Sequence, residues 1–189
     1  MPAVNSFMVP LGTTAPDFEL PSVEGRSVAL ADFAGAPALL VVFLSNHCPY
    51  VRHVEGSLAS LVADCAQAGL AAAGICANDA ASYPDDDAAH LAQQARRAGF
   101  AFPYLVDETQ DVARAYKAAC TPDFFLYDGA RSLAYRGQMD GARPGNKIPN
   151  DGRSLRAAID LVLDGKPVPG PHTPSVGCSI KWKPANAPA

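Results

Sequence analysis

The stretch ALLVVFLSNHCPYVR, residues 38–52, decides the fold of this chain. Residues 38–44 are an unbroken apolar run with β-branched side chains, which is typical of a strand covered on both faces of a sheet. From Val51 onwards, apolar residues recur at helical spacing. Cys48 and Pro49 lie between the two patterns. The sequence therefore predicts a strand that passes directly into a helix at a cysteine.

The same alternation of strand and helix patterns continues along the chain. Further strands are expected at 70–77 and 102–106, with a helix after each of them, the first of which is opened by the acidic run at 85–87. A β-hairpin is expected at 123–138 with Asp128-Gly129 at its turn, followed by a last helix that is capped by Asn150 or Asp151 and ends at Gly165. Alternation up to residue 119 requires parallel strands, and the hairpin adds antiparallel ones. We therefore expect an α/β protein with a mixed central sheet flanked by helices.

The two ends of the chain differ from this pattern. The N-terminal segment is expected to be an extension that adds a small hairpin. Residues 1–165 are predicted to form one domain, and residues 166–189, which are rich in proline, are predicted to form an extended C-terminal tail.

Composition restricts the class of protein. The chain has 189 residues, 49% hydrophobic and 18% charged, with a net charge of −4, which suits one globular domain with a sizeable core. No basic stripe is present, so nucleic acid is not expected as a partner. No apolar run approaches the roughly 18 to 20 residues of a membrane span. The first 18 residues contain no Lys or Arg and do not match a secretory signal, so we expect a cytoplasmic protein.

Cys48 is the candidate nucleophile. Pro49 suits the first position of a helix, where the free amides and the helix dipole favour a negative charge. His47, Arg52 and His53 add cationic or potentially cationic groups. Such surroundings lower the pKa of a cysteine to roughly 3.5–7.5, which predicts a thiolate at neutral pH. The alternative is a buried structural cysteine, but the strand–Cys–Pro–helix turn favours the reactive one.

Three sequence features together resemble a known family. They are the opening LGTTAPDFELPSVEGRSVALADFAGAPALLVVFL at residues 11–44, the Cys-Pro at the helix start, and Thr121-Pro122 before the hairpin. This combination resembles the thioredoxin-like superfamily and, within it, the alkyl hydroperoxide reductase / thiol-specific antioxidant (redoxin) family. The resemblance implies a cis-proline loop at Thr121-Pro122 facing Cys48. The residues expected to contact substrate there are Ser45, Asn46, His47, Pro49, Tyr50, Thr121 and Pro122.

The resemblance implies a thiol-dependent oxidoreductase with antioxidant or disulfide-reductase activity and no cofactor. Its expected partners are a peroxide or disulfide substrate and an external thiol reductant of the thioredoxin or glutathione type, and a homodimer is left open. The chain departs in detail from both the peroxiredoxin pattern and the thioredoxin pattern. Of the peroxiredoxin pattern P-x-x-x-[ST]-x-x-C the chain keeps Ser45 but has Val41 for the proline, and Pro122 stands where that family has an arginine before the FFLYD strand. The peroxide-activating arginine is therefore missing, or another arginine such as Arg52, Arg136 or Arg143 replaces it. Val51 stands where the C-x-x-C motif of thioredoxins has its second cysteine.

A single redox cysteine needs a second thiol to resolve its oxidised form. Cys65 and Cys76 lie in apolar patterns and are expected in the core. Cys120, two residues before Pro122, is the first candidate for the resolving thiol, because a disulfide needs Cα atoms within roughly 7 Å. Cys178 is the second, provided that the tail folds back, with Ile180 and Trp182 as apolar anchors. A pair between Cys120 and Cys178 is the remaining alternative.

Two other functions compete with the redox one. A copper or other metal site would use the soft ligands that this chain has, which are His47, Cys48, His53, Cys120 and Cys178. Their spacing matches no metal signature, and no paired C-x-x-C points to structural zinc, so no metal is predicted. A catalytically idle scaffold is the other alternative, and the Cys-Pro turn argues against it.

Overall fold

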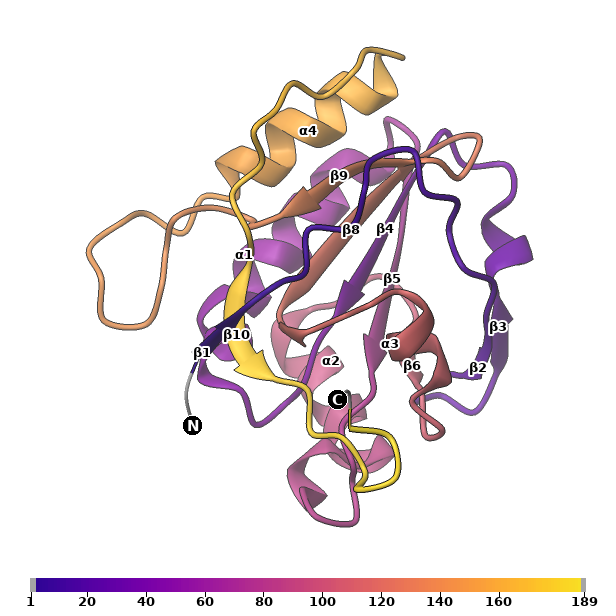
Figure 1. The fold of residues 1–189 in the computed structure, drawn as a ribbon, viewed down its shortest axis with the longest axis vertical. Coiled ribbons are helices and arrows are strands. Elements are labelled where there is room, and N and C mark those ends of the chain that lie inside the picture. The colour runs from indigo at the N-terminus through magenta and orange to yellow at the C-terminus, as the bar shows by residue number, and fades with distance from the viewer. Residues whose placement is uncertain (1–2, 188–189) are drawn as a thin grey trace.

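The computed structural model describes residues 3–187 and is built around a mixed five-stranded sheet (Figure 1). The strand order is β6-β5-β4-β8-β9, with β4 parallel to β5, β5 parallel to β6, and β8 antiparallel to both β4 and β9. This confirms the predicted α/β fold with a parallel core and an antiparallel hairpin. The strands are β4 (Ala38–Phe43), β5 (Leu70–Cys76), β6 (Tyr104–Val106), β8 (Asp123–Asp128) and β9 (Leu133–Gly137).

Helices cover both faces of the sheet because β4 is apolar at every position. Leu40 and Val42 point into a core shared with α1, α2 and α4, whereas Leu39 and Val41 point into a second core shared with α3. The N-terminal hairpin, which was expected, covers this second face with β2 (Glu19–Pro21) and β3 (Ser27–Ala29). The helices are α1 (Pro49–Ala66), α2 (Ala88–Ala98), α3 (Asp111–Ala115) and α4 (Arg153–Leu163), with short 3₁₀ helices η1 (Leu30–Phe33) and η2 (Pro84–Asp86).

Two helix starts differ from those predicted. The acidic run at 85–87 was expected to open a helix, but residues 84–86 form η2 and α2 starts one residue later. Asp87 is its N-cap and accepts a hydrogen bond from the His90 amide. The last helix was expected to be capped by Asn150 or Asp151, whereas the N-cap of α4 is Gly152, with a left-handed φ of 66°.

The C-terminal segment 166–189, expected as an extended tail, contributes a strand. β10 (Val176–Ser179) is the middle strand of a second antiparallel sheet, between β1 (Ala3–Asn5) and β7 (Cys120–Thr121). Figure 1 shows β10 in yellow beside β1 in indigo, so the two ends of the chain meet at the side of the central sheet. Ile180 is buried in the second core, and Trp182 packs against it. Both apolar anchors expected for this segment therefore contact the domain.

Among residues 3–187, no helix is long and apolar enough to cross a membrane.

Candidate functional site

Cys48 is the N-cap of α1, directly after β4, and Pro49 is the first helical residue. The peptide bond between Thr121 and Pro122 is cis, as the family resemblance implied. The Cys48 thiol donates a hydrogen bond to the Thr121 carbonyl oxygen, with 3.1 Å between sulfur and oxygen. The structure therefore brings together the cysteine and the cis-proline loop, which are 73 residues apart in the chain.

The surroundings of the Cys48 sulfur differ from those expected. We predicted a thiolate open to solvent and held by the amides of α1, but Cys48 is fully buried and its side chain makes no capping hydrogen bond. β10, which was not predicted, pairs with β7 beside the sulfur and places Cys178 next to Cys48, so this strand contributes to the burial. The structure thus shows a closed, reduced site.

Two hydroxyl groups complete the floor of this site. Ser45 Oγ and Thr121 Oγ1 are 3.0 Å apart, and both residues are buried. This pair joins the loop after β4 to the cis-proline loop, so it holds the Cys48 and Pro122 backbones at a fixed separation. Both residues were expected to contact substrate, and the structure places both of them beside the thiol.

Cys178 lies over the same site. On β10 it is the partner of Thr121, whose carbonyl oxygen accepts the Cys48 thiol. Burial, together with the neighbouring Cys48 thiol, raises the pKa of Cys178 to about 11. Both sulfurs are free thiols. Cys178, the second candidate for the resolving thiol, is therefore a direct neighbour of Cys48.

Cys120, the first candidate, is next to the site but is engaged elsewhere. Its thiol donates to the Pro122 carbonyl oxygen over 3.5 Å, and its partner on β10 is Ser179. Burial raises the pKa of Cys120 far above its usual value, and Asp123, Cys48 and Cys178 raise it further. Burial also raises the pKa of Asp123 to about 7. The Cys120 thiol therefore has a higher pKa than the Cys178 thiol and ionises less readily.

The two remaining cysteines are core residues, as expected. Cys65 is on the buried face of α1, near the Arg156 guanidinium, and Cys76 ends β5. Burial raises the pKa of both thiols.

Asn46 and His47 do not face the cysteine cluster. Both turn towards Asp86 of η2, a fully buried carboxylate that accepts hydrogen bonds from the Asn46 and His47 amides and from Nδ1 of His47 at 2.5 Å. Asn78 donates to the same carboxylate. Burial raises the pKa of Asp86, but the hydrogen bonds from His47 and Asn78 outweigh it and hold the pKa below its usual value. The two residues therefore shape the loop that carries Cys48.

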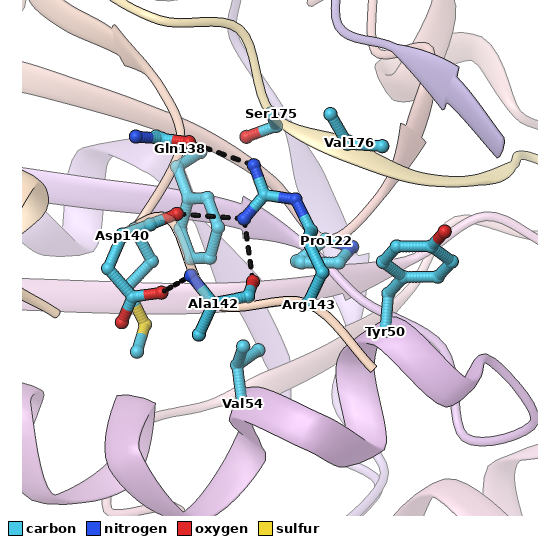
Figure 2. A pocket seen from close by; sticks show the side chains of 11 residues that line it. Tyr50, Val54, Pro122, Gln138, Asp140, Ala142, Arg143, Ser175 and Val176 are labelled. Carbon is cyan, nitrogen blue, oxygen red and sulfur yellow. Dashed lines mark hydrogen bonds between the residues drawn. The ribbon is translucent and has the colours of Figure 1, made fainter. Parts of the chain in front are cut away.

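A small cavity lies beside the cis-proline (Figure 2). Tyr50 and Pro122 line it together with Arg143, from the loop between β9 and α4. Figure 2 shows the Arg143 guanidinium bound by the carbonyl oxygens of Asp140 and Ala142 and by the Gln138 side chain, at 2.7–2.8 Å. The cavity volume is about 20 Å³, enough for about one water molecule. Tyr50 and Pro122 are the predicted substrate contacts that line this cavity, whereas Pro49 is exposed at the start of α1.

The arginines near the site are held by other partners. Arg52 donates from Nε to the Asn46 carbonyl oxygen, and Arg136 donates to the Val9 carbonyl oxygen and contacts His172. The Arg143 guanidinium is engaged as described above. Each of the arginines that were candidates to replace the peroxiredoxin arginine thus has its hydrogen bonds directed away from Cys48.

A metal centre finds no support in this arrangement. Within residues 3–187, no three or more His, Cys, Asp or Glu side chains are grouped in a way that would hold a metal ion. His47 is bound to Asp86, and the thiols of Cys48 and Cys120 donate to carbonyl oxygens.

Sequence reasoning missed two residues that shape the site. Asp86 was considered only as an acid in a helix start, because its partners are about 40 residues away in the chain. Gly177 was not singled out, although a glycine inside a strand is a signal for a close backbone approach. The carbonyl oxygen of Thr121 lies 2.0 Å from where a Cβ of Gly177 would be.

Comparison with known proteins gives the family. Two solved structures are similar over nearly the whole chain: a hypothetical protein from Sinorhizobium meliloti, 48% identical with a TM-score of 0.94, and an uncharacterized conserved protein from Geobacillus kaustophilus, 49% identical with a TM-score of 0.95. They cover 95% and 97% of this chain, and the alignments span 98% of each of theirs.

A more distant structure shares the fold alone. It is a thiol:disulfide interchange protein of the thioredoxin family from Chlorobium tepidum, 17% identical with a TM-score of 0.63, covering 80% of this chain and 97% of that one. No curated protein matches the chain. The profile of the AhpC/TSA family matches residues 11–136, two thirds of the sequence. The chain therefore belongs to the AhpC/TSA family and has a thioredoxin-like fold.

Proposed function

We propose that this protein is a thiol-dependent oxidoreductase in which Cys48 is the nucleophile and Cys178 is the resolving thiol. The observation that carries the proposal is the pairing of β10 with β7. It sets Cys178 opposite Thr121, whose carbonyl oxygen accepts the hydrogen bond from Cys48. Family membership and the cis-proline beside Cys48 support the same chemistry. Cys120 is the less suitable resolving thiol, because its sulfur contacts the Pro122 carbonyl oxygen.

The reaction balances as a two-electron exchange. The Cys48 thiolate attacks one sulfur of a substrate disulfide, and the other sulfur leaves as a thiolate, which forms a mixed disulfide. The Cys178 thiolate then attacks Cys48, releases the second substrate thiol and leaves a Cys48–Cys178 disulfide. With hydrogen peroxide, Cys48 becomes a sulfenic acid and one water leaves, and attack by Cys178 releases a second water. An external thiol reductant of the thioredoxin or glutathione type restores the two thiols.

Disulfide exchange suits the site better than peroxide reduction. A peroxidase needs a fixed positive charge or hydrogen-bond donor that polarises the O–O bond at the thiolate. Arg52, Arg136 and Arg143 all direct their hydrogen bonds to other groups. We therefore propose a disulfide as the preferred substrate, with slower peroxide reduction as a side activity. The cytoplasm, where thiols are kept reduced, is the proposed compartment.

The test is the reduction of a model protein disulfide with dithiothreitol as the reductant. Cys48→Ser is expected to lower the rate to background, because no other thiol faces the cis-proline in the same way. Cys65→Ser removes a thiol that lies in the core away from the site and is the matched control, expected to keep most of the rate. Full activity in Cys48→Ser would contradict the proposal.

A further inference from the structure

The segment that covers Cys48 is part of the chain itself. Residues 175–181, which we call the strap, comprise β10 and the residues on either side of it. With Cys48 fully buried and Cys178 only 5% exposed, no external thiol or disulfide reaches either sulfur while the strap is in place. Any reaction of Cys48 with a molecule from solution therefore requires the strap to move.

Hydrogen bonds fasten the strap at both ends. At its start, the Ser175 hydroxyl donates to the Gly137 carbonyl oxygen over 2.7 Å, and the Ser175 amide donates to the Ser6 hydroxyl over 3.0 Å. At its end, the Lys181 amide donates to the Asn78 side chain over 2.8 Å. The closed position is therefore a specific docked state and not a loose contact.

The middle of the strap is held by close backbone packing at one residue. A Cβ on Gly177 would lie 2.0 Å from the Thr121 carbonyl oxygen and 3.1 Å from the Pro122 nitrogen. Real Cβ atoms do not approach a backbone oxygen so closely, so only glycine lets β10 rest against the cis-proline peptide. The same carbonyl oxygen accepts the Cys48 thiol. The peptide group between Thr121 and Pro122 therefore contacts both the docked strap and the Cys48 thiol.

We propose that the strap is an autoinhibitory element: it occupies the edge beside the cis-proline, where it keeps Cys48 closed, and it must detach before a substrate can bind there. The proposal rests on the proposed function, because it identifies the regulation of the same cysteine. The edge of β7 can form backbone hydrogen bonds with one extended segment at a time, and β10 is the segment bound there. An incoming extended polypeptide therefore competes with the strap for the same hydrogen bonds.

The experiment measures how fast Cys48 is alkylated by iodoacetamide in the full-length reduced protein, with peptide mass mapping to distinguish the five thiols. Gly177→Ala places a Cβ against Thr121 and is expected to raise the rate at Cys48 at least tenfold, which corresponds to about 1.4 kcal/mol of lost docking. Gly56→Ala is the matched control, because Gly56 lies on the exposed face of α1 with no atom within 4 Å of its Cβ position. Its rate at Cys48 is expected to equal that of the wild type.

Ile180→Ala keeps the test valid if Gly177→Ala does not fold. Ile180 is the buried anchor of the strap, and its truncation is expected to raise the rate at Cys48 as well, along with faster hydrogen exchange at the Ile180 amide, which is bonded to Ala119. If Cys48 is alkylated at the same rate in the wild type and in whichever of these variants folds, the proposal that the strap is autoinhibitory is wrong. The alkylation rate can also rise in the variants while the oxidised wild type forms no Cys48–Cys178 disulfide. That result would support the autoinhibitory role of the strap and contradict the proposed redox pair.

Discussion

The two thiols of the proposed pair have different surroundings, and this difference supports the proposed order of their chemistry. Cys48 sits at a helix start and contacts a carbonyl oxygen, whereas Cys178 lies on a strand. Burial and the Cys48 thiol raise the pKa of Cys178 to about 11. At neutral pH, Cys178 is therefore mostly protonated, which suits a thiol that waits to resolve rather than one that attacks first.

This predicts how the closing step depends on pH. The thiolate is the attacking species, and burial, the largest cause of the raised Cys178 pKa, persists when Cys48 carries a disulfide and β10 is docked. Closure of the Cys48–Cys178 disulfide is therefore expected to keep accelerating as the pH rises from about 7 through the range where an ordinary cysteine ionises. Rapid-quench mass spectrometry after preloading Cys48 with a small aromatic disulfide measures this step. Cys120→Ser should show the same slope. A rate that levels off near pH 8.5, the approximate pKa of an ordinary cysteine, would contradict the assignment.

At the scale of elements, the sequence predicts those whose pattern is local. The run at 38–44 and the helical spacing after Val51 correctly predict β4 and α1, and the Asp128-Gly129 turn correctly places the hairpin. The sequence pattern alone could not predict β10, because a four-residue strand containing glycine is stabilised by its pairing with β1 and β7 and not by local propensity. The closure of Cys48 followed from the same long-range pairing and was missed with it.

The loop that carries Cys48 depends on η2 in the same long-range way. Asp86 accepts hydrogen bonds from the Asn46 and His47 amides and from the Asn78 side chain. Asp86→Ala leaves these donors without their acceptor and is expected to lower the free energy of unfolding by roughly 1–3 kcal/mol. Because the Asp86 pKa is below its usual value, this stabilisation is present above about pH 4 and is lost as the pH falls through the pKa of the folded protein.

Urea denaturation at neutral pH measures the effect of this substitution. Asp85→Ala, one residue away, is the matched control: its side chain is exposed, so its expected change is within about 0.5 kcal/mol. Similar losses in the two variants would show that Asp86 does not organise the loop.

At the scale of the whole molecule, the two sheets have separate tasks. The central sheet positions the turn between β4 and α1, and the smaller sheet of β1, β10 and β7 brings both chain ends to that turn (Figure 1). The alternation of strand and helix patterns predicted the first sheet, and the family resemblance predicted the cis-proline. The second sheet depends on residues beyond the 11–136 range that the family profile matches. The strap, which the sequence did not reveal, thus lies outside the range of the family profile, whereas Asp86 lies inside it.

The most direct test of the central claim is a disulfide map of the wild-type protein after oxidation with one equivalent of hydrogen peroxide. Digestion under non-reducing conditions and mass spectrometry identify the linked peptides. The pairing of β10 with β7 beside Cys48 predicts a single intramolecular bond between Cys48 and Cys178. A bond from Cys48 to Cys120, or one between Cys120 and Cys178 with Cys48 left free, would contradict it.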